Sequence, residues 1–371
     1  MHLPLWLKEF VFLKYRDRVI KRHQLDYLFW ETTLRCNLNC LHCGSDCTKA
    51  SGINDMPLAD FVKVLDDVKK NNPVKKLTVC ITGGEPLLRK DLEQAGREII
   101  KRGFKWGIVT NALALDKKRF YSLINAGMGS VSFSLDGFLE EHTYLRQNPN
   151  SFDKVIEAIK LVVEFTKENP YFGFDIITCV HSKNISILDE FRDFLISLGV
   201  ARWRIFSIFP SGRAKDNKLG LSPIEYKNLM DFISDTRSYK NKEGKSIFLN
   251  YSCEGYLGPY ELKARDYFYF CHGGITVGSV WCNGNVGACL SVRSPSLIQG
   301  NIYKRSFMDI WNNEFKAARD RSWSKIGKCK KCKKFKLCLG NSLHLYDSLE
   351  REVGRCNYQI ISQGLKESKR G

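Results

Sequence analysis

The distribution of cysteines is the feature of this chain that most limits what it can fold into. Of the 14 cysteines in 371 residues, three lie within residues 36–43 and eight lie between Cys253 and Cys356. No apolar run approaches the roughly 18 residues of a membrane-spanning helix, and the N-terminus lacks the features of a signal peptide. We therefore expect a cytoplasmic protein, whose cysteines stay reduced and serve metal or redox chemistry.

Short β-rich runs alternate with helical patterns from Tyr27 onward. The predicted strands are residues 28–34, 77–82, 106–110, 130–135, 172–180 and 203–209. Between the first two, Leu58, Phe61 and Leu65 recur at helical spacing after a proline. Six strand–helix units predict a parallel sheet with right-handed crossovers, that is, an α/β fold built on a partial (β/α)6 barrel. Functional residues then belong at the carboxyl ends of the strands.

Composition changes along the chain suggest several units. We expect a basic amphipathic segment (residues 1–25), the barrel (26–215), a helical bridge (216–249), a small cysteine-rich domain (250–360) and a basic tail (361–371). The first segment is expected to pack on the body of the protein, with peripheral attachment to a membrane or docking of a partner as the alternative.

The chain is strongly basic. Its net charge is +18, and residues 301–371 alone carry 17 basic and 7 acidic residues. A basic patch of this kind suits nucleic acid or an anionic membrane surface, but it also neutralises the negative charge of thiolate-bound iron–sulfur clusters. Because of the cysteines we favour the second explanation and expect no nucleic-acid partner.

Two motifs follow the first two predicted strands. Cys36, Cys40 and Cys43 have the spacing CxxxCxxC, and the sequence GGEP occupies residues 83–86. Three thiolates can hold a four-iron cluster and leave one iron open for a substrate or cofactor. Paired glycines let the backbone approach a ligand closely, and the glutamate adds a carboxylate.

In this order the two motifs resemble those of the radical S-adenosylmethionine (radical SAM) enzymes. The resemblance implies that a [4Fe-4S] cluster on the three catalytic cysteines binds S-adenosylmethionine (SAM) and cleaves it to a 5′-deoxyadenosyl radical, which abstracts hydrogen from a substrate. It implies cofactor contacts from Gly83, Gly84 and Glu85 at the amino group, from Asn111, Ser134 and Asp136 on the ribose side, and from Arg146 at the carboxylate. For the last four, ordinary capping of loops is the alternative.

The C-terminal cysteines resemble the SPASM extension of radical SAM enzymes that act on peptides and proteins. The match covers about residues 270–358 and implies two auxiliary [4Fe-4S] clusters. One cluster would be held by Cys329, Cys332, Cys338 and Cys356, and the other by Cys253, Cys271 and Cys289.

The chain departs from the SPASM pattern at Ser342, where a further cysteine is expected. The cluster on Cys271 and Cys289 is therefore expected to have an irregular or open site, which Cys282, Ser342 or a substrate atom could complete. Zinc is the alternative to iron–sulfur clusters, because four thiolates suit it equally well.

Almost the whole chain resembles the subgroup called the rSAM/lipoprotein system, through segments such as YLFWETTLRCNLNCLHCGSDC and DIWNNEF. The subgroup implies a lipoprotein or its precursor peptide as substrate. Leu290 follows the second SPASM cysteine, where sulfatase-maturing members are expected to carry an aspartate base. Formylglycine formation is therefore disfavoured.

These observations predict a radical SAM enzyme that modifies a peptide or protein after translation. The external electron donor would be a flavodoxin or ferredoxin. The first alternative is a radical SAM enzyme that acts on a small molecule or a tetrapyrrole-like cofactor precursor. The second is a non-enzymatic iron–sulfur or zinc scaffold that binds RNA or a membrane through its basic tail.

Overall fold

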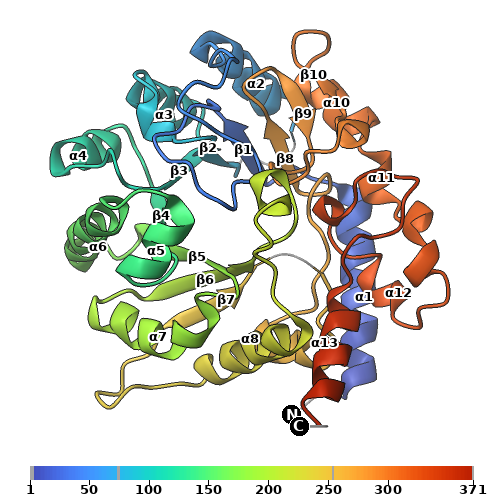
Figure 1. The fold of residues 1–371 in the computed structure, drawn as a ribbon. Helices are drawn as coiled ribbons and strands as arrows, with labels where there is room; N and C mark the ends of the chain where they lie inside the picture. The colour runs from blue at the N-terminus through green and yellow to red at the C-terminus, as the bar shows by residue number, and fades with distance from the viewer. Residues whose placement is uncertain (1–3, 73–75, 253–254, 370–371) are drawn as a thin grey trace.

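Ten strands form one sheet in the computed structural model, which describes residues 4–72, 76–252 and 255–369. The strand order is β10-β9-β8-β1-β2-β3-β4-β5-β6-β7 (Figure 1). The strands are β1 (Tyr27–Glu31), β2 (Thr78–Thr82), β3 (Lys105–Thr110), β4 (Ser130–Ser134), β5 (Gly173–Val180), β6 (Arg202–Ser207), β7 (Phe248–Tyr251), β8 (Val277–Val280), β9 (Asn285–Gly287) and β10 (Gly300–Asn301). All neighbours from β8 to β7 pair in parallel, and β9 and β10 add an antiparallel edge.

Helices surround the curved sheet, most of those between β1 and β7 on its outer side and the others beside the cysteine-rich region (Figure 1). They are α1 (Leu5–Arg22), α2 (Leu58–Asn71), α3 (Leu92–Lys101), α4 (Lys117–Asn125), α5 (Leu139–Arg146), α6 (Ser151–Glu168), α7 (Leu188–Ser197), α8 (Pro223–Thr236), α9 (Glu261–Ala264), α10 (Phe307–Asn313), α11 (Lys316–Arg319), α12 (Phe335–Cys338) and α13 (Asn357–Glu367). Each of β1 to β6 is followed by at least one helix before the next strand. The predicted α/β fold with a parallel sheet is therefore confirmed.

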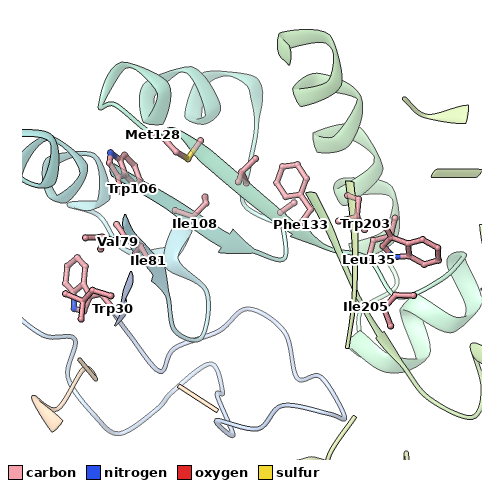
Figure 2. Packing of buried hydrophobic residues seen from close by; sticks show 14 of the residues in the cluster. Trp30, Val79, Ile81, Trp106, Ile108, Met128, Phe133, Leu135, Trp203 and Ile205 are labelled. Carbon is pink, nitrogen blue, oxygen red and sulfur yellow. The ribbon is translucent and has the colours of Figure 1, made fainter. Parts of the chain in front are cut away.

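The core lies between the sheet and these helices. The Trp30 ring on β1 stacks on Phe61 of α2, with centroids 3.9 Å apart. Figure 2 shows Trp106 on β3 and Trp203 on β6 among other apolar side chains of the core, and both are buried. Burying side chains of this size contributes about 2 to 3 kcal/mol each to folding. The apolar runs and helical spacings seen in the sequence supply these contacts.

The cysteine-rich region shares the sheet with the barrel strands. On one side β1 pairs with β2, and on the other it pairs with β8, so that Tyr27 lies opposite both Thr78 and Val277. The C-terminal helix α13 packs on α8, where Gly364 lies so close that a Cβ would meet the Pro223 carbonyl oxygen at 2.1 Å. The last part of the chain therefore returns to the barrel wall.

The N-terminal helix α1 packs on the cysteine-rich region. Phe12 lies 5.2 Å from the Phe268 ring, centroid to centroid. Arg16 Nη1 donates a hydrogen bond to the carbonyl oxygen of Lys336 at 2.7 Å. Among the described residues, no helix has both the length and the apolar character needed to span a membrane.

Candidate active site

A cavity of about 180 Å³ lies at the carboxyl ends of β1 to β4. Nine of the ten residues predicted for the cysteine loop and the SAM contacts line it: Cys36, Cys40, Cys43, Gly83, Gly84, Glu85, Asn111, Ser134 and Arg146. Parallel strands end at one edge of the sheet, which is why residues so far apart in sequence meet here. We call this space the SAM cavity.

The glycines of the GGEP motif join β2 to the loop that carries the cysteines. A Cβ on Gly83 or Gly84 would lie 2.3 Å from the Thr33 carbonyl oxygen or 2.1 Å from that of Arg35, respectively. The backbone N–H of Gly84 donates to Thr33 O at 2.7 Å, and that of Glu85 donates to Arg35 O at 2.9 Å. Only glycine permits this approach, and at Gly83 the φ of +144° also favours it.

The Glu85 carboxylate lies inside the cavity wall. It accepts hydrogen bonds from Thr110 Oγ1 at 2.7 Å and from the backbone N–H groups of Asn111 and Leu87 at 2.9 and 3.0 Å. Burial raises the pKa of Glu85 to about 6, although these bonds oppose the rise. A carboxylate can accept about four hydrogen bonds, so one acceptor position remains for a ligand amino group.

Arg146 and Asp136 form a buried ion pair behind the cysteines. Arg146 Nε lies 2.6 Å from Asp136 Oδ2, and Arg146 Nη1 lies 3.7 Å from Cys40 Sγ. Burial alone would raise the pKa of Asp136, but the Arg146 guanidinium, with His42 and His142, holds it at about 2. Asp136 does not line the cavity and instead orients Arg146, whereas the sequence suggested a contact on the ribose side.

Arg213 is a residue of this site that the sequence reasoning missed. Its Nε donates to Cys40 O at 2.8 Å and its Nη1 to Cys47 O at 3.0 Å, and its side chain lines the SAM cavity. Arg213 follows β6, so its place at the carboxyl end of a strand was the available signal. These hydrogen bonds fix the conformation of the cysteine loop, and the guanidinium group adds positive charge beside the thiols.

The three thiols fit a [4Fe-4S] cluster by donor type and surroundings. Burial raises the pKa of Cys36 to about 12, whereas a hydrogen bond with Cys47 lowers that of Cys43 to about 5. Iron binding offsets the cost of burying thiolates, and the two guanidinium groups nearby favour the negative cluster. Among the described residues, no three Cys, His, Asp or Glu side chains are grouped to ligate a single metal ion. A four-iron cluster instead distributes its cysteine ligands over separate irons.

A second cysteine site lies in the C-terminal region. Cys329, Cys332, Cys338 and Cys356 line one cavity of about 440 Å³, which we call the four-cysteine cavity. The Asn341 backbone N–H donates to Cys338 Sγ at 3.3 Å. Four thiols, together with lysines at the rim, fit a fully ligated cluster.

The other predicted auxiliary site is described only in part, because Cys253 lies outside the described residues. Burial raises the pKa of Cys289, and the neighbouring Cys271 adds to the rise. Ser342 is fully buried, and its Oγ lies 2.5 Å from the hydroxyl of Tyr269, two residues before Cys271. Cys282 contacts Glu31 Oε1 at 3.7 Å instead. Ser342 is one of the residues considered as an additional ligand of this cluster. Its hydrogen bond with Tyr269 holds it against the segment that leads into Cys271.

A third cavity, of about 220 Å³, lies between the cysteine loop and the segment after Cys289. We call it the adjoining cavity. His42 lines both this cavity and the SAM cavity, and its Nδ1 is buried with no hydrogen-bond partner among the described residues. Phe206, Phe209 and Leu290 supply apolar wall. A group bound here would contact the SAM cavity on one side and the Cys289 segment on the other.

One ion pair ties the two cysteine regions together. Glu31, the last residue of β1, is 1% exposed and pairs with Arg293, which also contacts Ser45 in the cysteine loop. Arg293 lies four residues after Cys289. The contact therefore fixes the position of the Cys289 segment relative to the loop that lines the SAM cavity.

Comparison with known proteins agrees with this geometry. Residues 30–195 match the radical SAM superfamily, and residues 271–333 match the SPASM iron–sulfur cluster-binding domain. The chain belongs to the radical SAM superfamily. Its C-terminal part is a SPASM domain, so the enzyme uses SAM, a [4Fe-4S] cluster and auxiliary iron–sulfur clusters.

Relatives of differing activity resemble the chain over most of its length. An AdoMet-dependent heme synthase from Methanosarcina barkeri is 26% identical, over 91% of this chain and 97% of the relative. A protein from Pyrococcus furiosus that modifies the cofactor of tungsten-containing aldehyde ferredoxin oxidoreductase is 30% identical, over 78% of this chain and 82% of the relative.

Among solved structures, Streptococcus suis SuiB bound to its precursor peptide SuiA is similar in fold. The TM-score is 0.69 at 18% identity, and the match covers 92% of this chain and 78% of SuiB.

Proposed function

We propose that this radical SAM enzyme modifies a peptide or protein after translation. The observation that carries the proposal is the adjoining cavity, which meets the SAM cavity at His42 and is small and lined by apolar and hydroxyl groups. Its volume of about 220 Å³ suits one amino-acid side chain better than a whole cofactor, because drug-sized ligands occupy about 300 to 1,000 Å³. The complex of SuiB with a precursor peptide is in keeping with this proposal.

The second candidate is a tetrapyrrole substrate, which the similarity to a heme synthase favours. Tetrapyrrole precursors carry several carboxylates, and a buried carboxylate requires a cationic partner. Among the described residues, the lining of the adjoining cavity includes no lysine or arginine. Charge and volume therefore both favour the peptide.

We assign the residues of the SAM cavity as follows. Cys36, Cys40 and Cys43 would hold the cluster that, when bound, supplies the electron for reductive cleavage of SAM. Glu85 would accept a hydrogen bond from the amino group of SAM, and Arg146, held in place by Asp136, would pair with its carboxylate. Asn111 and Ser134 would face the ribose.

The C-terminal cysteines would bind the auxiliary clusters. We assign Cys329, Cys332, Cys338 and Cys356 to one closed cluster, and Cys253, Cys271 and Cys289 to one with an irregular site. The exposed lysines around the first would balance its charge. A flavodoxin or ferredoxin would supply electrons from outside. The division of the chain at about residues 215 and 250 remains part of this proposal.

The deciding experiment offers both substrates to the same enzyme. Protein purified without oxygen is incubated with SAM and dithionite. A peptide encoded beside the gene, such as a lipoprotein precursor, is co-expressed, and its mass is compared with and without the enzyme. Iron coproporphyrin is supplied in a parallel reaction. We expect a changed peptide mass that Cys40→Ala abolishes. Turnover of the tetrapyrrole with an unchanged peptide would establish the second candidate instead.

A further inference from the structure

The outer face of α1 is the most apolar exposed surface that the structure describes. Five of the thirteen large apolar side chains that are exposed in the described chain belong to this one helix. Leu5, Trp6, Phe10 and Val11, which we call the apolar tip, are 58, 68, 53 and 55% exposed. They lie in the first two turns of α1, at an end of the molecule (Figure 1). A patch of this kind on a protein surface marks a contact site.

Positive charge continues from Phe10 along the outward face of α1. At 100° per residue, Lys14, Arg18 and Lys21 continue the outward side, opposite the buried Phe12 and Arg16, and all three are exposed. The two acidic residues of α1 are already paired, Glu9 with Lys334 at 3.6 Å and Asp17 with Arg16 at 3.3 Å. The outer face therefore carries net positive charge.

A second group of cations lies beside the helix. Lys328, Lys330, Lys331 and Lys333 are exposed in the segment that contacts α1 through Glu9 and Arg16. No ion pair involves these four side chains in the part of the chain described. The apolar tip is thus flanked by positive charge on α1 itself, whereas Lys328, Lys331 and Lys333 also line the four-cysteine cavity, where they would balance the charge of its cluster.

We propose that the outer face of α1 docks the protein on an anionic lipid bilayer, with the apolar tip inserted at the level of the headgroups. Trp, Phe and Leu on a helix flanked by Lys and Arg are the composition that enters the interface, and each basic residue near an anionic leaflet adds to the attraction. A symmetric dimer through the same face would bring its basic residues together and is disfavoured. An acidic protein would satisfy the lysines but leaves the apolar tip unexplained.

The test is flotation of the whole reconstituted protein with lipid vesicles. We compare vesicles of phosphatidylcholine with vesicles that also contain phosphatidylglycerol, at low and high salt. The variant Trp6→Ala/Phe10→Ala removes two exposed rings, so its fold and SAM binding should be unchanged. We expect wild type to float with the anionic vesicles only, and the variant to bind about tenfold more weakly. Lys14→Gln/Arg18→Gln should weaken binding about fivefold for each charge removed and reduce the salt dependence.

A matched control variant and three outcomes test the proposal. Tyr171→Ala/Tyr303→Ala removes two rings that are 100 and 56% exposed on other parts of the protein, and should float as wild type does. The proposal is overturned if wild type ignores anionic vesicles or if the Trp6→Ala/Phe10→Ala variant floats equally well. It is also overturned if the same variant loses self-association, or binding to a purified acidic flavodoxin, while vesicle binding is absent.

Discussion

The SAM cavity and the four-cysteine cavity hold similar thiols in very different frameworks. In the first, the loop is anchored to parallel strands, and Arg146, Arg213 and the GGEP glycines hold it by hydrogen bonds and close contacts. In the second, the cysteines lie on short turns and on the four-residue helix α12. We therefore expect the sheet to shape the first site before any metal binds, and the second site to depend on bound metal for its order.

The largest effect is expected from Cys40→Ala, which removes one thiol of the SAM cavity. Cleavage of SAM to 5′-deoxyadenosine should fall about a thousandfold or more, because the cluster loses a ligand. The melting temperature should change little, because the sheet and Arg213 keep the loop in place. Anaerobic turnover and thermal unfolding measure the two effects. Cys80→Ala, a buried thiol within β2, is the control and should retain cleavage.

Cys356→Ala should disrupt the four-cysteine cavity without abolishing the chemistry of the SAM cavity. Of the about twelve irons expected for three clusters, about four should be lost. SAM cleavage should persist while modified product disappears, and residues 325–356 should become sensitive to protease, since metal organises this segment. Iron analysis and limited proteolysis report the result. Full iron content and an unchanged digest would mean that this region folds without its metal. The two cavities would then not differ in their dependence on metal.

Asp136→Asn tests whether a residue that does not line the SAM cavity helps to position the residues that do. The change keeps the shape of the side chain but removes the charge that pairs with Arg146. The dissociation constant of SAM should rise about tenfold, because a buried guanidinium loses the carboxylate that orients it. Equilibrium binding to the reconstituted enzyme measures this. Asp189→Asn, at an exposed ion pair on α7, should leave SAM binding unchanged.

The smallest effect is expected from pH. Burial raises the pKa of Glu85 from 4.5 to about 6, so its protonated form is favoured in the folded state, and its contribution to stability declines as the pH rises from about 4.5 to 6. SAM binding has the opposite sign, because the amino group needs the carboxylate. Between pH 7.5 and 5.5 the affinity should fall about fourfold. Glu85→Gln should bind more weakly and show no such slope. A sloping profile in that variant would assign the titration to another group.

Much of the fold and of the SAM cavity could be predicted from local sequence. The β-rich runs correspond to β1 to β6, and the motif residues meet because parallel strands end at one edge. The helix predicted from Leu58, Phe61 and Leu65 corresponds to α2, which begins at Leu58 directly after Pro57. Such features depend on neighbours in sequence, and they are therefore readable from it.

Contacts between distant segments could not be predicted. The ion pair of Glu31 with Arg293 and the hold of Arg213 on the cysteine loop join residues far apart in the chain, and no spacing encodes them. Asp136, expected on the ribose side of the cofactor, pairs with Arg146, and nothing in the sequence indicates that this carboxylate satisfies a buried guanidinium. Pairing of β8 with β1 also has no local signal.

The position of β1 between β2 and β8 has a practical consequence. A shortened chain that ended before β8 would leave β1 as an edge strand, with the backbone groups of residues 27–30 unpaired along one side. Exposed edges of this kind recruit strands from other molecules and promote aggregation. The barrel strands of this enzyme therefore need the cysteine-rich region to remain monodisperse, even for studies confined to the chemistry of SAM.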